Sequence, residues 1–123
     1  VLKVRGIRGA TTADDNSKES ILHATTELLE RVVEANDIHT EDVAAVLFTT
    51  TEDLDAEFPA LAARQMGWEY VALMCGQEMV VPGRQGHCIR VLVLLNTIKA
   101  QYELSNIYLK GAFNLRDRGT VEM

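Results

Sequence analysis

Apolar residues recur at helical spacing over residues 17–35, with leucine, isoleucine and valine on one side and charged residues on the other. This pattern predicts an amphipathic surface helix. Asn16 precedes the segment and is expected to be its N-cap. A shorter helix is predicted over residues 58–65, because Pro59 suits a first helical turn and Gly67 suits the end of a helix.

Branched and apolar runs predict strands in the rest of the chain. The strands are expected at residues 1–7, 43–51, 88–96 and 106–110, with further extended segments at 68–73 and 78–81. A connection with one helical turn is expected between the last two strands. Because helices and strands do not alternate regularly, the sequence predicts an α+β fold: a mixed β-sheet with one long amphipathic helix and short helices.

Length and charge limit the number of domains and the kinds of partner that the chain can have. The chain has 123 residues and a formal net charge of −6, which predicts a single domain over residues 1–123 and disfavours nucleic acid or an anionic membrane as partner. No apolar run approaches the roughly 20 residues that span a bilayer, and no segment resembles a secretion signal. Cys75 and Cys88 form no CxxC motif, so a reducing, cytoplasmic location is expected.

Three arginines are candidates for binding an anion. Arg90 lies within the predicted strand 88–96, where its fork of donors needs an anionic partner if it is buried. The alternatives are an exposed arginine on an edge strand or a partner for an internal carboxylate. Arg8, between two glycines, either points into a cleft or is solvated. Arg64 comes late in a short helix, where a cation suits the helix C-terminus.

Other polar side chains have equally plausible structural roles. Glu78 either accepts a hydrogen bond from a ligand hydroxyl or forms a salt bridge at a strand end. Cys75 has no local histidine partner, so a small buried apolar role is favoured over a nucleophile. Tyr108 either offers its hydroxyl to a carboxylate or is a half-buried residue of a sheet.

Several common kinds of catalytic site are missing from the sequence. The three histidines have no metal-ligand spacing, and the chain has no phosphate-binding loop and no convincing pair of nucleophile and base. We therefore expect no metal site and no cofactor. The remaining set of arginines, one tyrosine and one glutamate is suited to binding a small polyanion and to stabilising charge electrostatically.

A series of short stretches runs in order along nearly the whole chain. The stretches are RGIRGATT at 5–12, FPA at 58–60 with Arg64, GW at 67–68, Cys75 with QEM at 77–79, CIRV at 88–91, YL at 108–109 and LR at 115–116. In combination they resemble the trimeric monofunctional chorismate mutases of bacteria. The first stretch and the Ile-Arg-Val strand are specific when they occur together.

The resemblance implies a homotrimer that forms a pseudo-α/β-barrel, with sheets inside, helices outside and active sites shared between subunits. It implies the rearrangement of chorismate to prephenate in aromatic amino-acid (Phe/Tyr) biosynthesis. This unimolecular Claisen reaction needs no nucleophile, base, metal or cofactor. The enzyme must hold the compact diaxial conformer and stabilise charge as the ether C–O bond breaks.

The resemblance also implies a role for each candidate residue. Arg90 would donate to the ether oxygen, and Glu78 would accept from the ring hydroxyl, with Cys75 as a polar neighbour of that hydroxyl. Arg8 and Tyr108 would hold the side-chain carboxylate. The other residues implied are Met74, Gly76 and Gln77 as pocket lining, Phe58 and Leu115 as apolar walls, and Arg64 and Arg116 as peripheral positive charge.

Two alternatives remain at this point. A trimeric imine deaminase of the Rid type shares the architecture of strands meeting at subunit interfaces, and the strand with Arg90 followed by residues 106–108 is loosely similar to that family. Against it, the opening motif and Gln77-Glu78 match the chorismate mutases. A non-catalytic sensor of an aromatic-pathway dicarboxylate is the second alternative, because binding and catalysis would use the same arginines.

Overall fold

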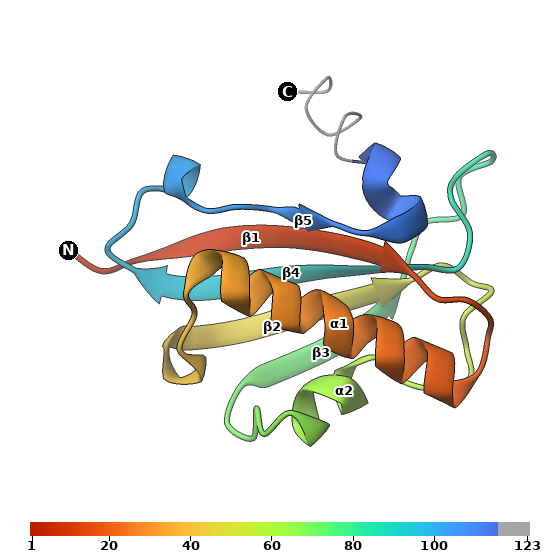
Figure 1. Cartoon of the computed structure of the whole chain (residues 1–123), viewed down its shortest axis with the longest axis horizontal. Helices are drawn as coiled ribbons and strands as arrows, with labels where there is room; N and C mark the ends of the chain where they lie inside the picture. Colours follow the sequence, from red (N-terminus) through yellow and green to blue (C-terminus); the bar gives the residue numbers. More distant parts are fainter. Residues whose placement is uncertain (116–123) are drawn as a thin grey trace.

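Five strands form one sheet in the computed structural model of the protein, which describes residues 1–115 (Figure 1). The strands are β1 (Lys3–Thr12), β2 (Val43–Thr50), β3 (Ala72–Gln77), β4 (Cys88–Thr97) and β5 (Ile107–Tyr108). Their spatial order is β3-β2-β4-β1-β5, so β4 is central. It runs antiparallel to β1 and β2, while β3 is parallel to β2 and β5 is parallel to β1. The predicted mixed sheet is confirmed.

Two α-helices cover one face of this sheet (Figure 1). They are α1 (Lys18–Asn36) and α2 (Ala60–Gln65). The described residues also form three short 3₁₀ helices: η1 (Thr40–Asp42), η2 (Gln101–Glu103) and η3 (Lys110–Asn114). The predicted long amphipathic helix and short helices are therefore present, giving an α+β fold. Within residues 1–115, no helix is both long and apolar enough to cross a membrane.

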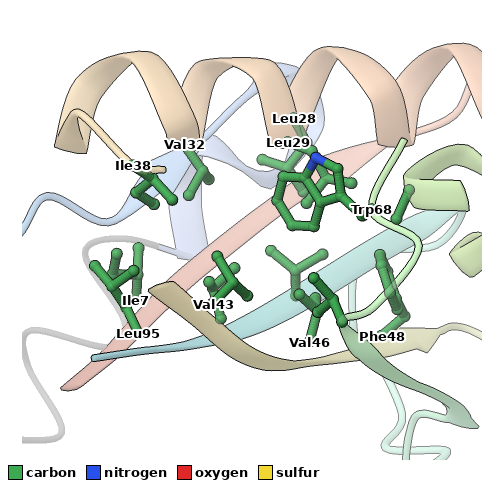
Figure 2. Close-up of a cluster of buried hydrophobic side chains, with 14 of the residues drawn as sticks. Ile7, Leu28, Leu29, Val32, Ile38, Val43, Val46, Phe48, Trp68 and Leu95 are labelled. Atoms are coloured by element: carbon green, nitrogen blue, oxygen red, sulfur yellow. The ribbon is translucent and has the colours of Figure 1, made fainter. Parts of the chain in front are cut away.

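The main hydrophobic core lies between α1 and the sheet (Figure 2). Leu28, Leu29 and Val32 of α1 pack onto strand residues that include Phe48 of β2, and all four are buried. Trp68, in the segment after α2, is also buried in this cluster. Burying each such side chain is worth about 1.5–3 kcal/mol, so this interface fixes which face of the sheet is left for a ligand.

The N-terminus of α1 differs from the prediction by one residue. Ser17, not Asn16, is the N-cap, and its hydroxyl accepts the Ser20 N–H at 3.1 Å. Asn16 instead accepts the N–H groups of Asp55 and Ala56, both at 3.0 Å, and donates to the Asp55 carboxylate at 2.8 Å. Asn16 therefore does not cap the helix. It binds residues far along the chain and holds the loop that follows β2 in place.

β1 continues to Thr12, past the predicted end at residue 7, because its residues pair with β4 as far as Cys88. A Cβ atom at Gly9 would lie 3.2 Å from Leu28 Cδ1 and 3.3 Å from the carbonyl oxygen of Ile107. A side chain at position 9 would therefore need its neighbours on α1, β4 or β5 to shift by a few tenths of an ångström.

The predicted extended segments around β3 were displaced along the chain. Residues 68–73 were expected to be extended, yet Trp68 donates its N–H to the Ala63 carbonyl at 3.1 Å and completes the end of α2. The strand forms later, at Ala72–Gln77, and residues 78–81 lie outside it. The last predicted strand, 106–110, is shortened to β5 because η3 begins at Lys110.

Candidate active site

One row of residues crosses all five strands on the face opposite α1 and α2. From β5 to β3 it consists of Tyr108, Ala10, Arg90, Thr49 and Gly76. The next row on this side consists of Arg8, Leu92, Leu47 and Met74. We call this side, defined by the two rows, the open face. Because β4 is central, Arg90 is not on an edge strand.

Arg90 forms an ion pair with Glu78 at the end of β3. The Arg90 Nε lies 2.6 Å from Glu78 Oε1, and the Thr49 hydroxyl donates to the same oxygen at 3.1 Å. The Glu78 N–H donates to the carbonyl of Thr50 at 2.8 Å and holds the backbone of Glu78 beside β2. Half of the Arg90 side chain stays exposed, against one fifth of the Glu78 side chain. The arginine therefore combines a carboxylate partner with access to solvent.

A cavity of about 660 Å³ opens over this ion pair. Five predicted site residues line it: Arg8, Glu78, Arg90, Tyr108 and Leu115. Two guanidinium groups and a phenol provide donors for an anionic ligand, while the carboxylate provides an acceptor for a hydroxyl. The cavity is thus chemically suited to a small polyanion that also carries a hydroxyl group.

Five of the remaining predicted residues line two further cavities beside the β3 edge of the sheet. Gly76 and Gln77 line a second cavity of about 320 Å³, Arg64 lines a third of about 390 Å³, and Phe58 and Cys75 line both. Met74 is exposed on the open face and lines none of these three cavities. Arg116 lies outside the described residues.

The alternation of side chains along β3 explains which face of the sheet Cys75 is on. It pairs with Phe48 of β2, which is buried in the core, so Cys75 faces the helix side instead of the open face. Burial raises the pKa of the Cys75 thiol above its ordinary value of 9.0, against smaller opposing effects of the Ala60 backbone and the Arg64 charge. The thiol is therefore protonated at neutral pH, which disfavours a nucleophilic role.

The connection between β3 and β4 forms one wall of the first cavity. Of this segment, only Glu78 was among the predicted site residues. Met79, Val81 and Arg84 of this segment line the cavity. Arg84 is anchored by an ion pair of 2.9 Å to Glu52, in the loop after β2. The sequence carries a turn signal here, Pro-Gly at 82–83, but nothing in the pattern places the turn over Arg90.

Asp53 fastens the other end of this connection. Its carboxylate accepts the His87 N–H at 3.0 and 3.1 Å and the Thr51 hydroxyl at 2.5 Å. Burial raises the pKa of Asp53, but the Thr51 and His87 hydrogen bonds and the charge attraction of the His87 ring outweigh burial. The pKa therefore lies below its ordinary value of 3.8. These interactions favour the ionised form, so Asp53 stabilises the cavity wall most strongly while it is ionised.

Replacing Asp53 by asparagine is expected to lower the Tm by about 2–5 °C at neutral pH, because charge-assisted hydrogen bonds to the connection are lost. The folded-state pKa of Asp53 is lowered, so its contribution is complete above the ordinary value of 3.8 and is lost as the pH falls through the folded-state value. Thermal unfolding of both chains between pH 7 and pH 3 measures this. The exposed Asp42 gives a matched control, Asp42→Asn. A Tm difference that stays constant down to pH 3 would contradict the assignment.

Comparison with known proteins identifies the family. The family model for chorismate mutase type I matches residues 4–118. The chain is 49% identical over 114 residues to the chorismate mutase AroH of Thermus thermophilus, covering 92% of this chain and 93% of that protein. It is 43% identical over 116 residues to the chorismate mutase AroH of Bacillus subtilis, covering 94% of this chain and 91% of that protein.

A solved structure agrees with these sequence matches. A chorismate mutase from Clostridium thermocellum superposes with a TM-score of 0.86 at 47% sequence identity, covering 87% of this chain and 96% of that one. The family match, the two relatives and the shared fold all extend over most of the chain. The chain belongs to the chorismate mutase type I family.

Proposed function

We propose that this protein is an isomerase that converts chorismate to prephenate in the cavity above Arg90. Family membership supports the reaction. The observation that carries the assignment of the site is the Arg90–Glu78 ion pair, which lies in one cavity with Arg8 and Tyr108. The substrate is a dicarboxylate with a ring hydroxyl and an ether oxygen, and the cavity offers both cationic donors and a carboxylate acceptor.

The proposed roles follow from where charge develops. Arg90 donates to the ether oxygen, which gains negative charge as the C–O bond breaks. Glu78 accepts the ring hydroxyl and lies near the positive charge that develops on the ring. Arg8 and Tyr108 bind the side-chain carboxylate and hold the diaxial conformer, which brings the reacting carbons together. Leu115 forms an apolar wall, and no step requires proton transfer to the protein.

We further propose a homotrimer in which each active site is built from two chains. In one chain, Arg90 and Glu78 line the first cavity, while Phe58, Cys75 and Arg64 lie together at the β3 edge. A neighbouring chain that presents its β3 edge to the first cavity would unite the two sets. Met74, Gly76 and Gln77 belong to the same edge strand.

The apolar surface of the open face also supports assembly. Four large apolar side chains on this side of the molecule are at least one third exposed: Val4 at 57%, Leu47 at 38%, Met74 at 67% and Leu92 at 36%. Leu92, Leu47 and Met74 are direct neighbours across three strands, and contiguous exposed apolar surface of this kind usually marks an interface. Packing sheets inward with the helices outside would bury these side chains and form the expected pseudo-α/β-barrel.

The biological setting belongs to the same proposal. We place the reaction in the biosynthesis of phenylalanine and tyrosine and, because both cysteines are free thiols, in the cytoplasm. The family match favours a mutase over the imine deaminase alternative. A non-catalytic sensor would use the same arginines, and turnover separates it from an enzyme.

The deciding experiment follows the loss of chorismate absorbance in the ultraviolet with purified protein and a metal chelator. Conversion to prephenate at about 1–10³ per second, the range of ordinary enzymes, is the expected result. Tight binding of a bicyclic transition-state mimic without turnover would instead indicate a sensor. The absence of both turnover and binding would reject the assignment of this cavity. The imine deaminase alternative would then be tested next.

A further inference from the structure

We propose that Thr49 is a positioning residue that orients the Glu78 carboxylate toward the substrate hydroxyl, an inference that rests on the proposed function. Thr49 lies on β2, directly across from Arg90 on β4. Its hydroxyl donates to Glu78 Oε1 at 3.1 Å, and Thr49 lines the same cavity as both partners. No feature of the sequence pattern marked this residue.

The geometry divides the two carboxylate oxygens into different roles. Both the Thr49 hydroxyl and Arg90 Nε are directed to Oε1. With one oxygen held from two sides, rotation of the carboxylate is restricted and Oε2 is the oxygen presented to a ligand. A hydrogen bond to an ionised group is stronger than one between neutral groups, so a single hydroxyl is enough to bias this orientation.

The two restraints on Glu78 differ in what they do during catalysis. Arg90 has half of its side chain exposed, and in the proposed mechanism it turns donors toward the ether oxygen. Thr49 is half-buried between two neighbouring strands, and its branched side chain is restricted at χ1. Thr49 therefore keeps Glu78 in place while Arg90 interacts with the substrate.

Thr49→Val tests this role, because it removes the hydroxyl while keeping the shape and the β-branching of the side chain. We expect kcat for chorismate to fall by about 10- to 30-fold, with a change in KM of less than about threefold. Thr49→Ser, which restores the hydroxyl, is expected to recover most of the lost kcat. Thermal unfolding of both variants shows whether the fold is kept, and valine is well suited to a strand.

Repeating Thr49→Val in a Glu78→Ala chain distinguishes positioning of Glu78 from a general structural effect. If Thr49 acts through Glu78, Thr49→Val will change the residual kcat by less than about twofold when Glu78 is already alanine. Equal losses in both backgrounds would overturn the role, as would wild-type kcat in Thr49→Val. A wild-type chain that does not convert chorismate would overturn the proposed function itself, and this inference with it.

Discussion

Arg90→Ala is expected to reduce kcat by about two to three orders of magnitude, equivalent to about 3–4 kcal/mol or more of transition-state stabilisation. The guanidinium lies on the central strand beside Glu78 and lines the cavity. Its proposed donation to the ether oxygen strengthens as negative charge grows there. We therefore expect a smaller effect on KM than on kcat, as measured by steady-state ultraviolet assays.

Two further variants sharpen this experiment. Arg90→Lys keeps the charge but loses the planar fork, so its kcat should lie between those of the wild type and Arg90→Ala. Arg31→Ala removes an exposed arginine from α1, on the other side of the sheet, and should leave kcat unchanged. Near wild-type turnover in a folded Arg90→Ala chain would rule out the proposed role of Arg90.

Mixing two inactive variants is expected to restore activity if the active site is shared between chains. The first variant, Arg90→Ala, damages the cavity half of the site. The second combines Phe58→Asp with Arg64→Glu, which places negative charge at the β3 edge and repels a dianionic substrate. Each variant alone should be nearly inactive, because every site in its trimer contains one damaged half.

The size of the recovery follows from the symmetry. In a cyclic trimer containing both variants, one site joins an intact cavity to an intact β3 edge, so random assembly from equal amounts should give about one quarter of wild-type activity. The variants must be refolded together or co-expressed, and mixing them after assembly is the control. No recovery in verified mixed trimers, or full activity in a demonstrated monomer, would contradict a two-chain site.

Local sequence patterns were sufficient for the elements with strong periodicity. Residues 17–35 carry an uninterrupted amphipathic repeat, and α1 forms at Lys18–Asn36. The apolar run 88–96 forms β4, in which strand alternation puts Arg90 and Leu92 together on the open face. These elements bury a continuous apolar face, so hydrophobic burial and local pattern favour the same structure.

Tertiary contacts determined what the local pattern did not predict. The start of β3 depends on how Trp68 packs into the core and completes α2. Thr49 meets Glu78 only because the register of β2 against β3 places the end of β3 beside Thr49. A sequence pattern specifies which residues alternate within a strand, but not which residue on the next strand lies opposite.

The candidate site was accessible from sequence mainly through the family resemblance. Arg8, Glu78, Arg90 and Tyr108 each had a structural role that was equally reasonable in isolation. The fold places them around one cavity although they come from four different segments of the chain. Convergence of these side chains is a property of the sheet topology, so motif spacing along the sequence could not reveal it.

The tight fit at Gly9 links the helix side of the sheet to the geometry of the cavity. Arg8 and Ala10 flank this glycine and face the cavity, while its missing Cβ would contact Leu28 and Val91 on the helix side. A bulkier side chain in place of Leu28 is expected to push the strand outward and carry Arg8 with it. Natural variation in substrate affinity can therefore arise from core positions of α1 that never touch a ligand.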